Sequence, residues 1–181
     1  MATLTIELPS RQNIAEANLR RWDELLADPK LARLDERVET DRFGHVIMSP
    51  PPSAHHGSYQ FRIGVLLDQQ MRRGRVITEC PVSTADGVKA ADVAWASPEC
   101  LQELGNKACF LRAPEICVEV VSPGNTQAEI QEKTALYFDA GAQEVWHCGD
   151  GGKMTFLALA KNEPLRKSQM CPDFPERVKL H

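Results

Sequence analysis

The sequence contains no long hydrophobic run and no segment with the character of a secretion signal. Its best apolar stretch, residues 116–121, is interrupted by Glu119 and falls far short of the roughly 20 residues that a membrane span requires. Residues 1–11 show no basic segment followed by an apolar core, so we expect no signal peptide. These two absences predict a cytoplasmic protein that does not enter a membrane.

Paired cysteine motifs are also missing. The six cysteines include no C-x-x-C pair and no Cys/His group with the spacing of a zinc finger. In a chain without a signal peptide, we expect these thiols to stay reduced and to fill small spaces in the core or on the surface. The fold should therefore need neither disulfides nor a structural metal.

Positive charge is not in excess. Lys and Arg together number 21 against 25 Asp and Glu, which gives a formal net charge of −4. A dedicated DNA-binding module is usually basic, so this balance counts against nucleic acid as an obvious partner. It does not exclude one, because an acidic metal site adds negative charge that a bound cation offsets.

What is present is the composition of a folded domain. The chain has 181 residues, of which 43% are hydrophobic and 25% are charged. This length is enough for one domain, or two small ones at most, and the hydrophobic content excludes disorder as a description of the whole chain.

Periodicity and turn residues predict alternating helices and strands. Asp86-Gly87 between two extended runs is a strong hairpin signal, and Thr126 and Glu129 have the spacing of a capping box. Helices are predicted over residues 14–26, 53–73 and 126–140, a short helix and loop over 97–113, a hairpin over 37–48, and strands over 75–85, 88–96, 115–121, 144–148 and 154–160. This order predicts an α/β domain with a mixed β-sheet flanked by helices.

Two of the predicted strands carry a carboxylate among apolar residues. In the strand over 88–96, Asp92 shares a face with small alanines, although the pattern also fits a solvated strand residue. Glu119 lies in the middle of the strand over 115–121, which otherwise has the pattern of a buried strand. A buried carboxylate needs a cation, a metal or a raised pKa. The alternative is an edge strand with Glu119 facing water.

The helix after this strand places a lysine among apolar positions. Ile130, Lys133 and Tyr137 fall at i, i+3 and i+7, which is one face of a helix. Lys133 would then be a cation on the side that faces the sheet. The alternative is a surface pair with Glu129, worth about 0.3–0.5 kcal/mol. Periodicity leaves both interpretations open.

Two carboxylates from neighbouring strands and a lysine would form a plausible catalytic set. Carboxylate oxygens suit Mg²⁺, which keeps several waters and is usually held by one or two protein carboxylates. Such a metal lowers the pKa of a bound water and stabilises charge on a phosphoryl oxygen, and a lysine beside it can orient that water. A third acidic residue, Glu39, lies in the first hairpin and means little alone.

Two further groups have weaker signals. His55 and His56 open the second helix, but nothing pairs them with a nucleophile, so we expect a surface or packing role rather than one as ligand or base. The run Arg72, Arg73 and Arg75 is a compact basic cluster. It could contact phosphate, or it could complement the dipole at a helix C-terminus.

An ordered series of these residues resembles a widespread bacterial family of restriction-endonuclease-like proteins within the PD-(D/E)XK nuclease superfamily. The most specific part is the strand 118–123, VEVVSP, followed by Lys133 and Tyr137 four residues apart. The series covers roughly residues 37–160. It consists of Glu39, Ser49-Pro50, His56, Ala91-Asp92-Val93, the segment 114–123 (PEICVEVVSP), Lys133, Tyr137, Gly141 and Glu144-Val145-Trp146.

The resemblance implies a restriction-endonuclease-like fold, a Mg²⁺ (or Mn²⁺) site at Asp92 and Glu119, and hydrolysis of DNA phosphodiester bonds. Two departures stand out: position 91 is Ala where the superfamily often has Pro, and position 121 is Val where the motif would place Lys. In similar proteins the lysine role is thought to move to the following helix, which points to Lys133. The implied division is a helical extension (1–36), a nuclease-like core (37–160) and a C-terminal tail (161–181).

Two hypotheses of function follow. The first is a metal-dependent endonuclease in which Asp92 and Glu119 hold the metal, Lys133 helps to orient the attacking water, and Glu39 is a candidate for the metal's outer shell. The second is a nuclease-fold protein that binds a nucleic acid or protein partner without cleaving it, which the acidic net charge and Val121 favour. Contact with DNA would depend on local patches such as residues 72–75, on bound metal, or on a second subunit in a homodimer.

Overall fold

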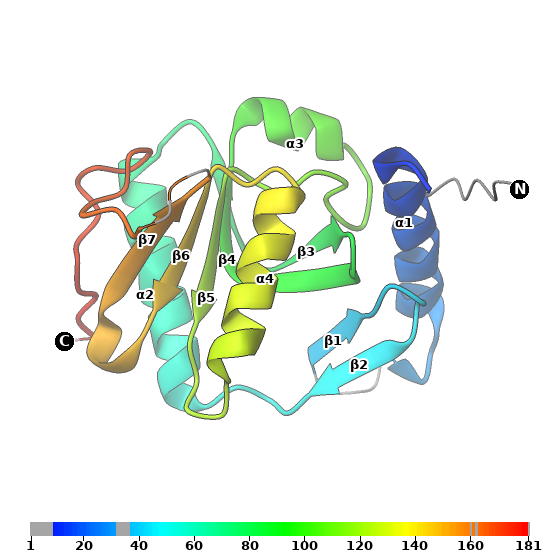
Figure 1. Cartoon of the computed structure of the whole chain (residues 1–181), viewed down its shortest axis with the longest axis horizontal. Coiled ribbons are helices and arrows are strands. Elements are labelled where there is room, and N and C mark those ends of the chain that lie inside the picture. Colours follow the sequence, from blue (N-terminus) through cyan, green and yellow to red (C-terminus); the bar gives the residue numbers. More distant parts are fainter. Residues whose placement is uncertain (1–8, 32–36, 160, 162, 181) are drawn as a thin grey trace, which may run out of the picture.

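The computed structural model of the chain describes residues 9–31, 37–159, 161 and 163–180 (Figure 1). Helices and strands alternate in the order expected from the sequence. They are α1 (Arg11–Ala27), β1 (Arg37–Thr40), β2 (Val46–Ser49), α2 (Ala54–Gln70), β3 (Arg75–Thr84), β4 (Gly87–Ala96), α3 (Pro98–Leu104), β5 (Ile116–Val120), α4 (Gln127–Asp139), β6 (Glu144–Cys148), the 3₁₀ turn η2 (Asp150–Gly152) and β7 (Met154–Ala158).

A five-stranded sheet with the order β3-β4-β5-β6-β7 organises the chain. Strands β5 and β6 are parallel and are joined through α4, whereas the other neighbours are antiparallel. A parallel pair needs such a crossover, because the chain must return to the same end of the sheet. The predicted mixed α/β fold is confirmed.

Helices cover both faces of this sheet (Figure 1). Ile63 and Leu67 of α2 pack with Val118 and Trp146 on one face. Tyr137 of α4 packs with other residues of β4, β5 and β6 on the opposite face. The alternation of side chains along each strand thus supplies two separate apolar layers. Among the described residues, no helix combines the length and the apolar character needed to cross a bilayer.

Strands β4 and β5 diverge after a short ladder. Their pairing runs from Trp95 opposite Ile116 to Val93 opposite Val118, while β4 continues beside β3 as far as Gly87. The first half of β4 therefore leaves β5, and its free edge needs other hydrogen-bond partners.

The β1–β2 hairpin supplies those partners. Val88 N donates to Thr40 Oγ1 (2.8 Å), and Ala90 N donates to Glu39 Oε1 (3.0 Å). The ammonium of Lys89 donates to the Thr40 carbonyl (2.9 Å). The hairpin is thereby fixed against β4 at the point where β4 leaves the main sheet.

Both ends of the described chain contribute buried side chains. Trp22 and Leu25 of α1 pack near Val88, and Phe174 and Val178 of the C-terminal segment join the α2-side core. The division into extension, core and tail stays a prediction about the sequence. The six cysteines are free and buried, as expected of residues that fill small spaces.

We predict that Phe174→Ala lowers the free energy of unfolding by about 3–5 kcal/mol, because it opens a cavity beside two aromatic rings. Phe174 is 2% exposed, and its ring centroid lies 4.7 Å from that of Trp146. Urea denaturation measures the change. Phe61→Ala is the matched control, since Phe61 is 71% exposed, and an equal loss in the two variants would contradict the prediction.

Candidate active site

Asp92 lies on β4 where this strand leaves β5. Its side chain is only 1% exposed, so the interpretation as a solvated strand residue is wrong. Oδ2 accepts a hydrogen bond from Val120 N (2.6 Å), and Oδ1 lies 2.5 Å from Nη1 of Arg37. The carboxylate therefore fills the opening between the two strands and is compensated on both oxygens.

Glu119 lies on β5, between β4 and β6 in the sheet. The edge-strand alternative is wrong, because β5 is paired on both sides. Its side chain is 12% exposed. Oε1 accepts a hydrogen bond from the Tyr137 hydroxyl (2.7 Å), and Oε2 lies 3.3 Å from Nζ of Lys133. Glu119 is thus a nearly buried carboxylate held by two residues of α4.

Lys133 reaches from α4 over the sheet. Its Nζ lies 2.8 Å from Glu39 Oε1 and 3.3 Å from Glu119 Oε2. The alternative pairing with Glu129 is wrong, since Glu129 Oε2 accepts from Thr126 N (2.8 Å) in the capping box that begins α4. Of the two interpretations that periodicity left open, the structure shows the sheet-facing one.

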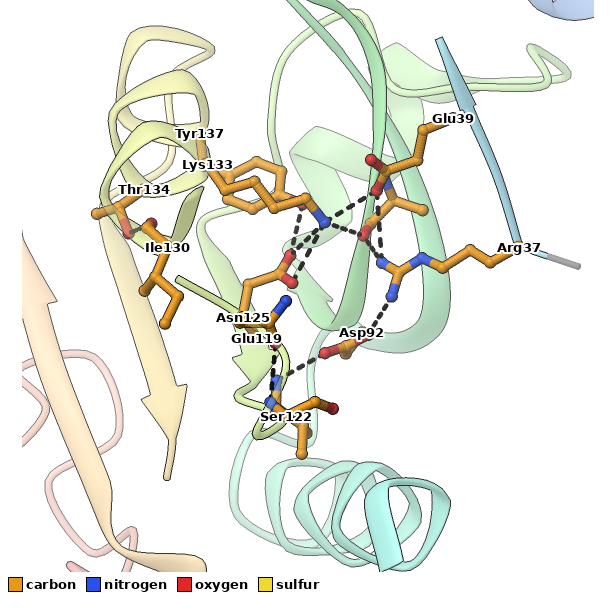
Figure 2. A network of polar contacts seen from close by, with 12 residues as sticks. Arg37, Glu39, Asp92, Glu119, Ser122, Asn125, Ile130, Lys133, Thr134 and Tyr137 are labelled. Atoms are coloured by element: carbon orange, nitrogen blue, oxygen red, sulfur yellow. Dashed lines mark hydrogen bonds and ion pairs between the residues drawn. The ribbon is translucent and has the colours of Figure 1, made fainter. Parts of the chain in front are cut away.

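Glu39 joins this group from β1. Its Oε1 bonds both the Lys133 ammonium and the Ala90 amide. Figure 2 shows the side chains of Glu39, Asp92, Glu119 and Lys133 pointing toward a common region, although Lys133 contacts Glu119 and Glu39 rather than Asp92. Asp92 is tied to Glu119 through the backbone amide of the next residue, Val120.

Arg37, which the sequence analysis did not single out, is the second cation of this group (Figure 2). Besides Asp92, its guanidinium contacts Glu79 (Nε to Oε2, 3.2 Å) and Glu39 (Nη2 to Oε1, 3.7 Å), and it donates to the Ala90 carbonyl. Arg37 and Glu39 are two apart on a strand and share a face. That spacing was a signal that could have placed Arg37 beside the carboxylates.

Glu79 also escaped sequence analysis. It is the one non-glycine residue among those described with a positive φ, 50°, and it lies where the β3–β4 register passes over Asp92 without a pair. Gln60 Nε2 donates to both Glu79 Oε1 and the Asp92 carbonyl, each at 2.8 Å. Nothing in the sequence marks a left-handed glutamate inside a strand.

The two histidines differ from each other. His56 Nε2 lies 3.3 Å from Asp92 Oδ1, and its Nδ1 lies 3.3 Å from Ser122 Oγ. Contact with Asp92 raises the pKa of the His56 imidazole. His55 is exposed, whereas His56 lies against Asp92, and the role expected of each histidine stays a prediction.

The arginine cluster lies at the other end of α2 from His56. All three of its members are exposed, and none takes part in the contacts described above. Both interpretations of this cluster, phosphate contact and a match to the helix dipole, stay open. The members are Arg72, Arg73 and Arg75.

Electrostatics sets the protonation of the group. Burial raises the pKa of Glu119 to about 7, with Lys133 opposing and Asp92 adding to the shift. Burial also disfavours the charged form of Asp92, but contact with His56 and the charge of Arg37 outweigh it and lower the pKa of Asp92. For Lys133, burial acts against the charge, yet Glu119 and Glu39 keep its pKa raised.

The donor set fits a hard cation such as Mg²⁺, which takes oxygen ligands and is usually held by one or two carboxylates with several waters. Glu39, Glu79, Asp92 and Glu119 carry four negative charges when ionised, against the two positive charges of Arg37 and Lys133. Among the residues described, no three His, Cys, Asp or Glu side chains form a ready-made metal cage. The cation that contacts Asp92 in this structure is the guanidinium of Arg37.

A mixed sheet flanked by helices, with carboxylates and cations where two strands diverge, is the arrangement that the resemblance to restriction-endonuclease-like proteins implies. Residues 22–153 match the model of the family described as "Putative restriction endonuclease" (Uma2). Because this match covers more than half of the chain, the chain belongs to that family, and the resemblance stated above is confirmed.

One solved structure illustrates the fold. The crystal structure of "a putative nuclease belonging to DUF820" from Anabaena variabilis ATCC 29413 superposes with a TM-score of 0.65 at 18% sequence identity. The match covers 87% of this chain and 93% of that chain. The search of curated proteins finds no match.

We predict that wild-type stability falls relative to Glu119→Gln as the pH rises from about 4.5 to about 7 without divalent metal. In this window the folded state still holds the Glu119 proton while the unfolded chain has released it, so folding becomes less favourable as pH increases. Urea denaturation of both chains in EDTA at pH 5, 6, 7 and 8 measures the difference. Parallel pH profiles would contradict the raised pKa of Glu119.

Proposed function

We propose that this chain is a metal-dependent endonuclease that hydrolyses DNA phosphodiester bonds. The observation that carries the proposal is a network of contacts where β4 and β5 diverge. Lys133 contacts Glu119, and Asp92 accepts a hydrogen bond from Val120 N, the residue that follows Glu119. Membership of a family described as restriction endonucleases, and a neighbour described as a nuclease, support the same reaction class.

In this proposal Asp92 and Glu119 hold Mg²⁺ or Mn²⁺. The ion would lower the pKa of a coordinated water and offset negative charge on the phosphoryl group. Tyr137 fixes the orientation of Glu119 through a hydrogen bond from its hydroxyl, and the His56 imidazole lies beside Asp92, with Nε2 3.3 Å from Oδ1. These positioning residues limit the freedom of carboxylates whose geometry must suit a small ion.

Lys133 would act on the reacting groups directly. Its raised pKa keeps the ammonium charged at neutral pH, and the side chain is 23% exposed, so one face remains open to a substrate. A charged donor there can orient the attacking water or stabilise charge that develops on a phosphate oxygen. Glu39 holds this ammonium from the other side.

A second function, nucleic acid or protein binding without cleavage, is favoured by one specific observation. Arg37 already neutralises Asp92, so this carboxylate has a cation without a bound metal. In that case divalent metal would not bind at millimolar concentration. Assembly as a homodimer, which would supply a second DNA-contacting face, stays a prediction that light scattering can test.

We expect Asp92→Asn to abolish Mg²⁺-dependent cleavage of plasmid and linear DNA, with a loss of about a hundredfold or more, because one metal ligand loses its charge. Asp68→Asn is the matched control, since Asp68 is an exposed residue of α2. Thermal melts of both variants check that folding is retained. Equal cleavage by wild type and Asp92→Asn would refute the assignment of Asp92.

Lys133→Met should reduce the cleavage rate by a similar order while leaving metal binding in place, because Lys133 acts on the water or phosphate rather than on the metal. Lys167→Met is the control, as Lys167 is exposed. Cleavage is followed on gels and metal binding by calorimetry. Undiminished cleavage by Lys133→Met would remove the lysine from the mechanism, whereas DNA binding without cleavage in every chain would favour the second function.

A further inference from the structure

Asp92 offers one carboxylate oxygen toward the site. Its Oδ2 is engaged by the Val120 amide inside the sheet, which leaves Oδ1. That oxygen lies 2.5 Å from Arg37 Nη1 and 3.3 Å from His56 Nε2. Any cation that binds Asp92 from the open side must therefore share or replace the contact made by Arg37.

Arg37 has a second carboxylate within reach. Its Nε lies 3.2 Å from Glu79 Oε2, so the guanidinium spans the buried Asp92 and the outer Glu79. The Glu79 side chain is 45% exposed, whereas Asp92 is almost fully buried. An arginine fork can keep one partner while it releases the other, because its donors point in different directions.

The backbone of Glu79 adds an independent observation. A left-handed φ in a non-glycine strand residue is strained and persists only when the surroundings impose it. Here the side chain is held by Gln60, which also holds the β4 backbone at Asp92. The strained backbone at Glu79 thus goes together with a carboxylate that lies beside Arg37 and close to Asp92.

We propose that Arg37 is an internal competitor for the divalent cation, which holds Asp92 in the metal-free chain and retreats to Glu79 when a cation binds Asp92. Arg37 and Glu79 are positioning residues in this scheme, since they act through Asp92. The inference rests on the metal site of the proposed function. The inference gives Glu79, with its strained backbone, and Arg37 a function beside the carboxylates.

The scheme predicts opposite effects of the two residues on metal affinity. Arg37→Gln removes the competitor and should tighten Mn²⁺ binding about tenfold or more. Glu79→Gln removes the position to which Arg37 retreats and should weaken binding about threefold or more in the presence of Arg37. In the double variant the Glu79→Gln change should have little further effect, because no guanidinium remains to be accommodated.

Calorimetric titration of MnCl₂ into the wild type, the two single variants and the double variant measures this cycle. Arg72→Gln is the matched control for a lost positive charge, since Arg72 is exposed beyond the end of α2. Asp92→Asn should bind no Mn²⁺ at the site. Thermal melts in EDTA establish that each chain is folded before titration.

The outcomes separate the inference from the proposed function. Equal affinities of wild type and Arg37→Gln, both lost in Asp92→Asn, would overturn the inference while the metal site stands. A loss from Glu79→Gln that is as large without Arg37 as with it would also overturn it, because Glu79 would then act on the metal directly. Failure of every chain to bind Mn²⁺ would overturn the inference together with the metal site.

If Arg37→Gln does not fold, Arg37→Lys carries the test with Glu79→Gln. A lysine keeps the charge but has no fork with which to hold two carboxylates, so Mn²⁺ should bind Arg37→Lys more tightly than the wild type. Unchanged or weaker binding by Arg37→Lys would overturn the inference. None of these readouts depends on cleavage of DNA.

Discussion

A carboxylate taken out of water must be compensated by charge or by hydrogen bonds, and in this chain that requirement falls on Asp92 and Glu119. Asp92 has the Val120 amide and Arg37, whereas Glu119 has Tyr137 and Lys133. Each carboxylate therefore depends on elements that the rest of the chain must bring to it. Arg37 comes from β1, and Tyr137 and Lys133 come from α4.

The divergence of β4 from β5 provides the space for this compensation. A continuous ladder would have paired the Val120 amide with a backbone carbonyl, but here a side chain takes that hydrogen bond. The same divergence exposes an edge of β4, which the hairpin covers with Thr40 and Glu39. One departure from regular pairing thus positions residues from three separate strands.

Much of the order of helices and strands could be predicted from the sequence, because it depends on local residue patterns. The capping box of Thr126 marks where α4 begins, and the helical periodicity puts Lys133 on one face with Ile130 and Tyr137, although only the structure shows that this face meets the sheet. The position of β5 inside the sheet was not predictable, because pairing on both edges depends on distant strands. Glu79 was missed for the same reason, since its role arises only when β3 meets β4, whereas the spacing of Arg37 and Glu39 on one strand was a signal for Arg37.

Part of the negative charge of the chain is concentrated at this site. When all four carboxylates are ionised, they exceed the positive charges of Arg37 and Lys133 by two. Within the proposed function, a divalent cation cancels that local excess and removes the repulsion that a phosphodiester would otherwise meet. Metal and DNA would then bind in a coupled manner, because the first removes the electrostatic barrier to the second. An acidic protein can act on DNA in this way without a broad basic surface.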